Sequence, residues 1–228
     1  MKIVGMLGGT DWQLTALYCR EMNELAQRRL GAGHSAKMLI CNPDAAELAA
    51  LQEKGQWLEV GRLLEESGER LTLAGADFLL ICSHSLHIVA EQLAASVSAP
   101  FLHIGEAIGE RLQKEGISRA GMLGAAFALE QTFLRQRLAD NFGIELFLPD
   151  TAASFALHDL ISQGETEPTP ESRVRLAAIF DGFVGQGVEA IILGGRRIGR
   201  LALKTDCPLP IYDAVSLHVE AASRLALL

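Results

Sequence analysis

The strongest constraint on the fold is an internal repeat. The tetrapeptide Gly-Met-Leu-Gly occurs at Gly5–Gly8 and again at Gly121–Gly124, each time as an apolar run that leads into a turn of small residues. Two further pairs of segments match in the same order: residues 75–83 resemble 187–195, and residues 100–103 resemble 210–213. Apolar strands resemble one another, so a single match would carry little weight. Three matches in one order predict two similar halves with equivalent strand ends.

Each half has the pattern of alternating strands and helices. Apolar runs at residues 2–7, 78–81 and 188–193 are typical of strands buried on both faces of a parallel sheet. We therefore predict an α/β fold of two similar lobes, each a mostly parallel sheet flanked by helices. An internal pseudo-dyad is expected to relate the lobes, with a cleft between them. The first lobe is expected at residues 1–112 plus 208–228, and the second at residues 113–207.

Composition and charge narrow the class of partner. A hydrophobic content of 49% is ample for a core in a chain of 228 residues, and the net charge of −8 argues against binding to nucleic acid or to a membrane surface. No apolar run has the length of a membrane-spanning helix, and a strand pattern begins directly after Met1 in place of a signal peptide. We therefore expect a cytoplasmic protein whose partners are small molecules or other protein chains.

The cysteines and the first glycine turn lack the spacing of known cofactor motifs. The four cysteines lie far apart without a Cys-x-x-Cys pair, which favours free thiols over disulfides or a zinc site. The Gly8-Gly9 turn matches neither the dinucleotide-binding pattern nor the Walker loop. No metal and no organic cofactor are expected.

The best candidate for a functional site is the end of the apolar run at residues 78–81. This run stops in a polar cluster that contains Ser83, His84, Ser85 and His87, and Ser83 could cap the next helix. In open parallel sheets, ligands bind outside the carboxyl ends of the strands. The sequence therefore predicts a pocket at this strand end.

The order of these motifs resembles that of a known family, the cofactor-independent aspartate/glutamate racemases. The similar positions span nearly the whole chain and comprise Gly5–Gly9, Trp12, Thr15, Tyr18, His34-Ser35, Gly75–Asp77, His87, Pro100–Ile104, Gly121–Gly124, Glu130–Phe133, Gly187 and Ile192–Gly194. The resemblance implies a two-lobed pseudo-symmetric α/β fold, often a homodimer, and activity without pyridoxal phosphate. It also implies one acid/base thiol at the end of the central strand of each lobe, in patterns like Cys-Asn-Thr-x-x-His and Gly-Cys-Thr-Glu.

This chain departs from the family pattern at the decisive positions. Ser83 stands where the first catalytic cysteine is expected, and His84 replaces the asparagine that would hold the substrate carboxylate. Gly195 stands at the second cysteine position, and Arg196-Arg197 replaces Thr-Glu. The remaining substitutions fall at expected substrate-binding positions, namely Thr10, Asp11, Ala125 and Ala128. Cys82 lies one residue before Ser83, and strand alternation predicts that its side chain points away from it.

These substitutions leave two classes of function open. Abstraction of an α-proton without a cofactor needs a usable base, which a thiolate provides and a lone serine does not, so two-thiol racemisation is not expected. His84 or His87 could accept a proton beside Ser83 and Arg196 could bind a carboxylate, which would permit a one-sided isomerisation, elimination or decarboxylation. Alternatively, the protein is a non-catalytic homologue that binds a small anion, and His87 serves to order the strand end.

The predicted ligand is a small carboxylate or amino acid. The residues expected to line its cleft are Thr10, Asp11, Ser83, His84, Ser85, Ala125, Ala128 and Arg196. An imidazole nitrogen within hydrogen-bond reach of Ser83 and facing the cleft would favour an enzyme. Histidines that point away would favour the binding protein.

Overall fold

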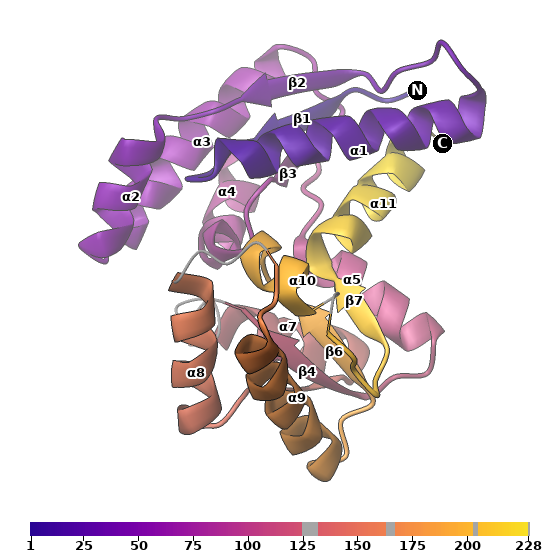
Figure 1. Cartoon of the computed structure of the whole chain (residues 1–228). Helices are drawn as coiled ribbons and strands as arrows, with labels where there is room; N and C mark the ends of the chain where they lie inside the picture. Colours follow the sequence, from indigo (N-terminus) through magenta and orange to yellow (C-terminus); the bar gives the residue numbers. More distant parts are fainter. Residues whose placement is uncertain (125–131, 163–166, 203–204, 228) are drawn as a thin grey trace. The chain divides into compact units, whose positions relative to one another are not determined.

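Figure 1 shows the computed structural model, which describes residues 1–124, 132–162, 167–202 and 205–227. Its contacts divide the chain into two units, Met1–Ile104 with His218–Leu228, and Gly105–Leu217. Each unit contains its own parallel sheet flanked by helices, so the predicted α/β class is confirmed.

The first unit is built on a three-stranded parallel sheet. Its strands are β1 (Val4–Leu7), β2 (Met38–Cys41) and β3 (Phe78–Ile81), in the spatial order β2-β1-β3. The helical segments of this unit are α1 (Trp12–Leu30), α2 (Ala45–Glu53), α3 (Trp57–Leu73), the 3₁₀ segment η1 (Ser85–Val89), α4 (Ala90–Ser96) and most of α11 (Ala214–Ala226). Both chain ends lie in this unit, where the Lys2 amide donates to the Ala226 carbonyl at 2.8 Å.

The central strands are fully buried, as their apolar runs predict. All four residues of β1 and all four of β3 are buried, because helices cover the sheet on both faces. A β-carbon at Gly5 in β1 would collide with Leu79 of β3 and with the β-carbon of Ala76, and it would lie 3.4 Å from the β-carbon of Leu71 in α3. The repeat glycine therefore allows β1 to pack closely against β3 and the residues just before it.

The second unit contains a four-stranded parallel sheet. Its strands are β4 (Arg119–Leu123), β5 (Glu145–Phe147), β6 (Ala190–Leu193) and β7 (Ile211–Asp213), in the spatial order β5-β4-β6-β7. Its helices are α5 (Ile104–Lys114), α7 (Thr132–Phe142), α8 (Thr151–Ser162), α9 (Pro170–Gly185) and α10 (Arg196–Ala202), with the first residue of α5 counted in the first unit. Thr169 caps α9, because its side chain accepts from the Ser172 amide and Pro170 occupies the first helical turn.

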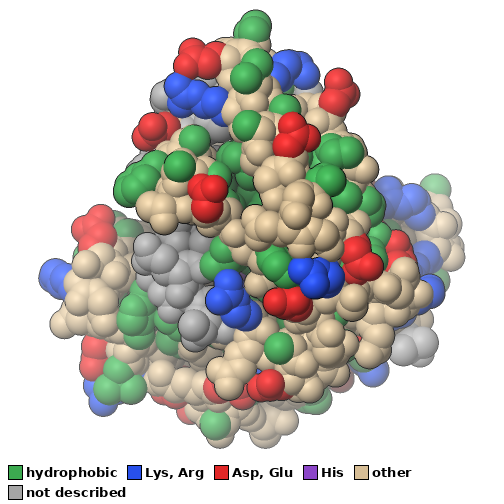
Figure 2. Space-filling view, turned by 90° about the horizontal axis from the view of Figure 1, so that it is seen from below, with side chains coloured by type: hydrophobic (Ala, Val, Ile, Leu, Met, Phe, Trp, Pro, Cys, Tyr) green, Lys and Arg blue, Asp and Glu red, His purple; other side chains and the backbone are tan. Residues whose placement is uncertain are grey.

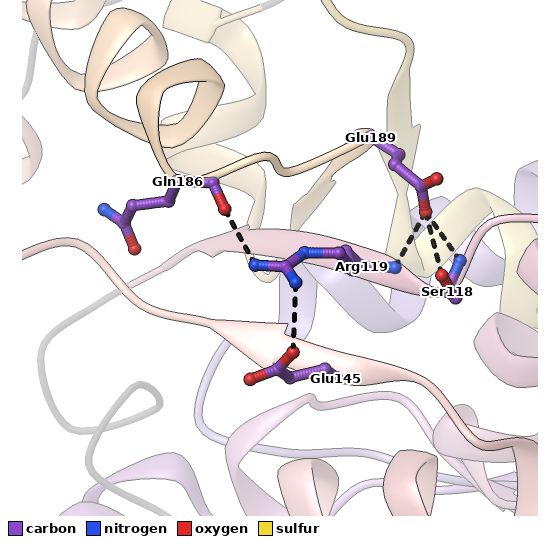
Figure 3. Close-up of polar contacts among 5 residues, drawn as sticks. All are labelled: Ser118, Arg119, Glu145, Gln186 and Glu189. Atoms are coloured by element: carbon purple, nitrogen blue, oxygen red, sulfur yellow. Dashed lines mark hydrogen bonds and ion pairs between the residues drawn. The ribbon is translucent and has the colours of Figure 1, made fainter.

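The two sheets repeat the same local devices, as the sequence repeat suggests. Asp77, just before β3, accepts from the Ile3 amide at the start of β1 through Oδ2 at 2.6 Å. Glu189, just before β6, accepts through Oε2 from the amides of Ser118 and Arg119 at 2.8 and 2.9 Å, as Figure 3 shows. In each unit, a carboxylate ahead of one strand thus fixes the start of its neighbour.

The chain leaves and re-enters the first unit at helices. Contacts place residues 105–112 and 208–217 with the second sheet, whereas the domain ranges expected from the sequence place them with the first. The reason for the second difference is β7, which pairs with β6 and so extends the second sheet. The domain ranges as such stay a prediction.

Candidate functional site

The carboxyl ends of β1 and β3 bring two segments of the first unit together. Leu7 pairs with Ile81, so the two strands end at the same level, and the Cys82 amide donates to the Leu7 carbonyl at 2.8 Å. Gly9 follows β1 and lies directly against Ser83: a β-carbon at Gly9 would be 2.9 Å from the Ser83 β-carbon and 3.3 Å from its Oγ. The glycine turn therefore packs directly against Ser83.

Asn42 belongs to the same edge, although the sequence did not single it out as a site residue. It follows β2, and a β-carbon at Gly8 would collide with its side-chain amide oxygen. Thr15, which is buried in α1, donates from Oγ1 to Asn42 Oδ1 at 3.3 Å. Asn42 could have been identified from its position directly after β2, because β2 ends at the same edge of the sheet as β1 and β3.

Ser83 lies at the centre of this edge and is 8% exposed. Its Oγ is 3.4 Å from Oγ of Ser85, the first residue of η1. The expected helix cap by Ser83 is not formed, because the residue that precedes η1 is His84 and no side chain caps this segment. The two hydroxyls instead form a pair that can both donate and accept.

His87 reaches Ser83 through the backbone. Its Nδ1 lies 2.7 Å from the Ser83 carbonyl oxygen, and its Nε2 accepts from the Ile104 amide at 3.2 Å. Burial, followed by the nearby His103 and His218, holds the pKa of His87 well below its usual range, while the bond to Ser83 opposes this shift. Both ring nitrogens are thus engaged with backbone groups, and the imidazole is neutral at pH 7.

His84 is also buried, at 6% exposure. Burial lowers the pKa of its imidazole to about 4. A histidine with such a pKa is uncharged near neutral pH and is a weak proton acceptor, since basicity falls with the pKa.

Cys82 does not restore a reactive thiol at this strand end. It is 1% exposed, and burial, with a smaller contribution from Cys19, raises its pKa well above the usual range. Its sulfur therefore stays protonated and inert at neutral pH.

Asp11 and Thr10 follow the glycine turn. Asp11 caps α1, because its Oδ1 accepts from the Gln13 amide at 3.0 Å. Thr10 is half-buried between Gly9 and Asp11. The carboxylate of Asp11 thus has a structural task at the start of a helix, where a negative charge is favourable.

The candidate residues of the second unit follow β6. Gly195 is half-buried, and a β-carbon added to it would meet nothing within 4 Å. Arg196 is the first residue of α10, but its side chain is outside the described part of the chain, and Ala125 and Ala128 lie in the undescribed segment 125–131. The facing of Ser83 and Gly195 stays a prediction, as do the catalytic roles of Ser83, His84 and His87.

The described residues carry no sign of a metal site or of a membrane-spanning helix. On the face shown in Figure 2, acidic and basic side chains are interspersed and no histidine is visible among the coloured atoms. Within the described ranges, no three His, Cys, Asp or Glu side chains are arranged to hold a metal ion. Among those same residues, no helix combines the length and apolar character needed to cross a membrane. The homodimer and the cytoplasmic location stay predictions.

Comparisons with known proteins identify the family of this chain and relatives with the same fold. The family model for Asp/Glu/Hydantoin racemase matches residues 7–222. The crystal structure of a candidate Asp/Glu racemase from Yersinia pestis is 33% identical with a TM-score of 0.94, and the match covers 100% of both chains. An aspartate racemase homologue from Pyrococcus horikoshii is 21% identical with a TM-score of 0.87, again over 100% of both chains. A more distant match in fold is arylmalonate decarboxylase, which is 15% identical with a TM-score of 0.51 over 98% of this chain and 92% of that one.

Proposed function

Because this chain belongs to the Asp/Glu/Hydantoin racemase family, we propose that it binds a small carboxylate or amino acid and does not racemise it by two-thiol proton exchange. The observation that carries this proposal is the set of hydrogen bonds at the carboxyl end of β3. The residue at that end is Ser83, and the imidazole of His87 is bonded to the Ser83 backbone carbonyl and not to its hydroxyl.

The chemistry of racemisation explains why these residues are insufficient. Removal of an α-proton needs a base whose pKa lies near the operating pH. Ser83 would need a neighbour to take its proton, but Oγ is paired with the hydroxyl of Ser85, and His84 has a pKa of about 4. The Cys82 thiol, held protonated by burial, cannot substitute.

The same groups are suited to holding a carboxylate. Hydroxyls of Ser83 and Ser85 can donate to an anion, and Gly9 has no side chain to keep a ligand away from the backbone. Arg196, whose side chain lies outside the described part of the chain, stays a predicted contact of the carboxylate. Thr10 is proposed as a further polar contact of the ligand.

A one-sided decarboxylation is the second candidate, favoured by the fold similarity to arylmalonate decarboxylase. Such a reaction needs no base in its first step, because the electron pair of the broken C–C bond stays on the α-carbon when CO₂ leaves. Hydrogen-bond donors stabilise the resulting enolate. A proton must then be delivered to that carbon, and here Ser83 is the proposed donor, which regains its proton from water.

The decisive experiment combines ligand binding with isotope exchange. Purified protein is incubated in heavy water with D- and L-aspartate, D- and L-glutamate and phenylmalonate, and the α-proton signals and CO₂ release are followed by NMR. Saturable binding of an acid without α-exchange supports the main proposal. CO₂ release from the malonate supports the lyase, and α-proton exchange by the unmodified protein would contradict both.

A variant with cysteines at positions 83 and 195 tests why no α-proton exchange is expected in the unmodified protein. Ser83→Cys is nearly isosteric, and Gly195→Cys has room for its β-carbon, so the double variant is expected to fold. We expect α-exchange in the double variant and none in either single variant. A variant with Ser85→Cys in place of Ser83→Cys is the matched control, and equal activity of the two doubles would contradict the assignment of Ser83.

A further inference from the structure

Four histidines are buried together in the first unit, and the proposed function gives none of them a role. His84, His87, His103 and His218 are 6%, 2%, 3% and 0% exposed. The ring centroid of His87 lies 4.7 Å from that of His103 and 5.5 Å from that of His218. Buried polar groups need hydrogen-bond partners, so the contacts of these rings determine what they do.

The hydrogen bonds of His87 fix its tautomer. A carbonyl oxygen only accepts, so the short contact of 2.7 Å to the Ser83 oxygen requires a proton on Nδ1. A backbone amide only donates, so the contact of 3.2 Å from the Ile104 nitrogen requires a lone pair on Nε2. His87 must therefore be neutral with its proton on Nδ1.

His87 accepts a hydrogen bond from the first residue of α5. Ile104 is the first residue of α5, and the first amides of a helix have no acceptor within the helix. Ile104 is also the last residue of the first unit before the chain continues into the second. The Nε2 lone pair thus holds the amide with which α5 begins, while Nδ1 holds the strand end that carries Ser83.

We propose that His87 is a positioning residue, a tautomer-locked clamp that couples the Ser83 strand end to the start of α5, and that acid opens this clamp. A proton on Nε2 would place two donors, the ring N–H and the Ile104 amide, against each other. It would also place a positive charge at the amino end of α5, where the helix dipole disfavours cations.

The surroundings of the ring support an opening by acid. The titratable groups that face His87 are His84, His103 and His218, and Phe101 is packed nearby with its ring centroid at 5.9 Å. Each of these imidazoles opposes a positive charge on His87. The Ser83 carbonyl is the one group recorded as favouring it, and it is already bound to Nδ1.

His218 provides an internal comparison. Its Nε2 donates to the Leu102 carbonyl at 3.1 Å, and its Nδ1 lies 2.9 Å from the Tyr18 hydroxyl, which donates to it. A proton on Nδ1 would be tolerated there, because the Tyr18 hydroxyl can rotate and accept. The Ile104 amide has no such freedom, so the loss of the bond to α5 is specific to His87.

The test uses the full protein and needs no ligand. Long-range ¹H–¹⁵N NMR of the histidine rings at pH 7.5 should show the Nδ1–H form for His87 and the Nε2–H form for His218. On lowering the pH toward 5, the amide exchange of Ile104, corrected for its intrinsic pH dependence, should accelerate before that of β1. An Nε2–H form of His87, or protection of Ile104 that is independent of pH, would overturn the proposal.

Two matched variants separate the halves of the clamp. In His87→Asn the amide nitrogen replaces Nδ1 but nothing replaces Nε2, whereas in His87→Gln the longer side chain can offer an oxygen to Ile104. We expect exchange at Ile104 to accelerate at least about tenfold in His87→Asn and much less in His87→Gln. The exposed His34→Gln is the control, and equal exchange in all three variants would contradict the coupling. If neither His87 variant folds, the ring tautomers of the unmodified protein still decide.

Discussion

The two sheets are alike where their strands begin and different where they end. At the beginning, Asp77 and Glu189 hold the starts of the neighbouring central strands. The repeat prolines have matching contacts as well. The Leu79 amide of β3 donates to the Pro100 carbonyl at 2.8 Å, and the Ile191 amide of β6 donates to the Pro210 carbonyl at 2.9 Å. At the end, the first unit presents hydroxyls and imidazoles, and the second presents Gly195 followed by α10.

This difference separates the requirements of folding from those of chemistry. A strand that paired one residue out of register would turn its apolar side chains to the wrong face of the sheet. The contacts that fix the strand starts are therefore constrained in both units. The strand ends carry no such constraint once the helix that follows can begin. A serine at position 83 and a glycine at position 195 are therefore compatible with an intact scaffold.

The largest expected difference between the units is their response to acid. All four buried histidines among the described side chains belong to the first unit. Burial lowers the pKa of both His84 and His218 from 6.5 to about 4. Between pH 6.5 and about pH 4, these two histidines are protonated in the unfolded chain but not in the folded chain. The free energy of unfolding therefore falls as the pH falls through this window. Each of the two histidines should lower it by about 3 kcal/mol across the window.

Denaturant unfolding at pH 7, 6, 5 and 4 measures this loss, and hydrogen exchange locates it. Peptides from the first unit should lose protection at a higher pH than those from the second. His34→Gln, at an exposed position, should leave the pH dependence unchanged. Denaturant midpoints that are the same at pH 7 and pH 5 would rule out the explanation.

The repeat glycines should differ in how well they tolerate a methyl group. At Gly5 an added β-carbon would collide with Leu79 and lie 2.9 Å from the β-carbon of Ala76, which cannot move without the backbone. At Gly121 it would meet the Phe183 ring at 2.9 Å and the end of Ile191 at 3.0 Å, both of which can adjust. We expect Gly5→Ala to cost about 3 kcal/mol and Gly121→Ala about 1 kcal/mol, measured by denaturant unfolding. Equal costs would mean that the two central strands are packed alike.

Much of the fold could be predicted because it follows from local patterns. The repeated apolar runs gave the strands, and the matched order gave two parallel sheets of the same kind. The pairing of β7 with the second sheet could not be predicted in the same way. A short apolar segment carries no information about which strand it pairs with, and only the pairing of β7 with β6 shows it.

The candidate site was predictable in place but not in the state of its groups. The polar cluster after β3 was identified from its position at a strand end, and Gly9 lies against Ser83 there. The burial of His84 and the two backbone partners of His87 depend on residues far away in the chain, such as Ile104. Asn42 was missed because one asparagine before a proline is typical of an ordinary turn.

The carboxylates at the strand starts should have smaller effects than Gly5→Ala. Asp77→Ala removes one acceptor from the Ile3 amide and should cost about 1 kcal/mol. Glu189→Ala leaves the amides of Ser118 and Arg119 without their acceptor and should lower the melting temperature more than Asp77→Ala does. Hydrogen bonds from these amides, first that of Ser118, hold the pKa of Glu189 below its usual range. A larger effect of Asp77→Ala in thermal unfolding would reverse the expected order.

The smallest expected difference concerns the edge of the second sheet, where the repeat pairs Arg119 with Ile3 of the first. Arg119 lies over the Phe147 ring, with its guanidinium carbon 4.7 Å from the ring centre, and donates to the Gln186 carbonyl at 2.8 Å. Its side chain is 43% exposed, so the contact with the ring should contribute only about 0.5 kcal/mol. A double-mutant cycle of Arg119→Gln and Phe147→Leu isolates this coupling from the other bonds of Arg119, because the bond to Gln186 is present in both Phe147 backgrounds. A coupling near zero would mean that the arginine is held at this edge by the Gln186 carbonyl and the Glu145 carboxylate and not by the ring.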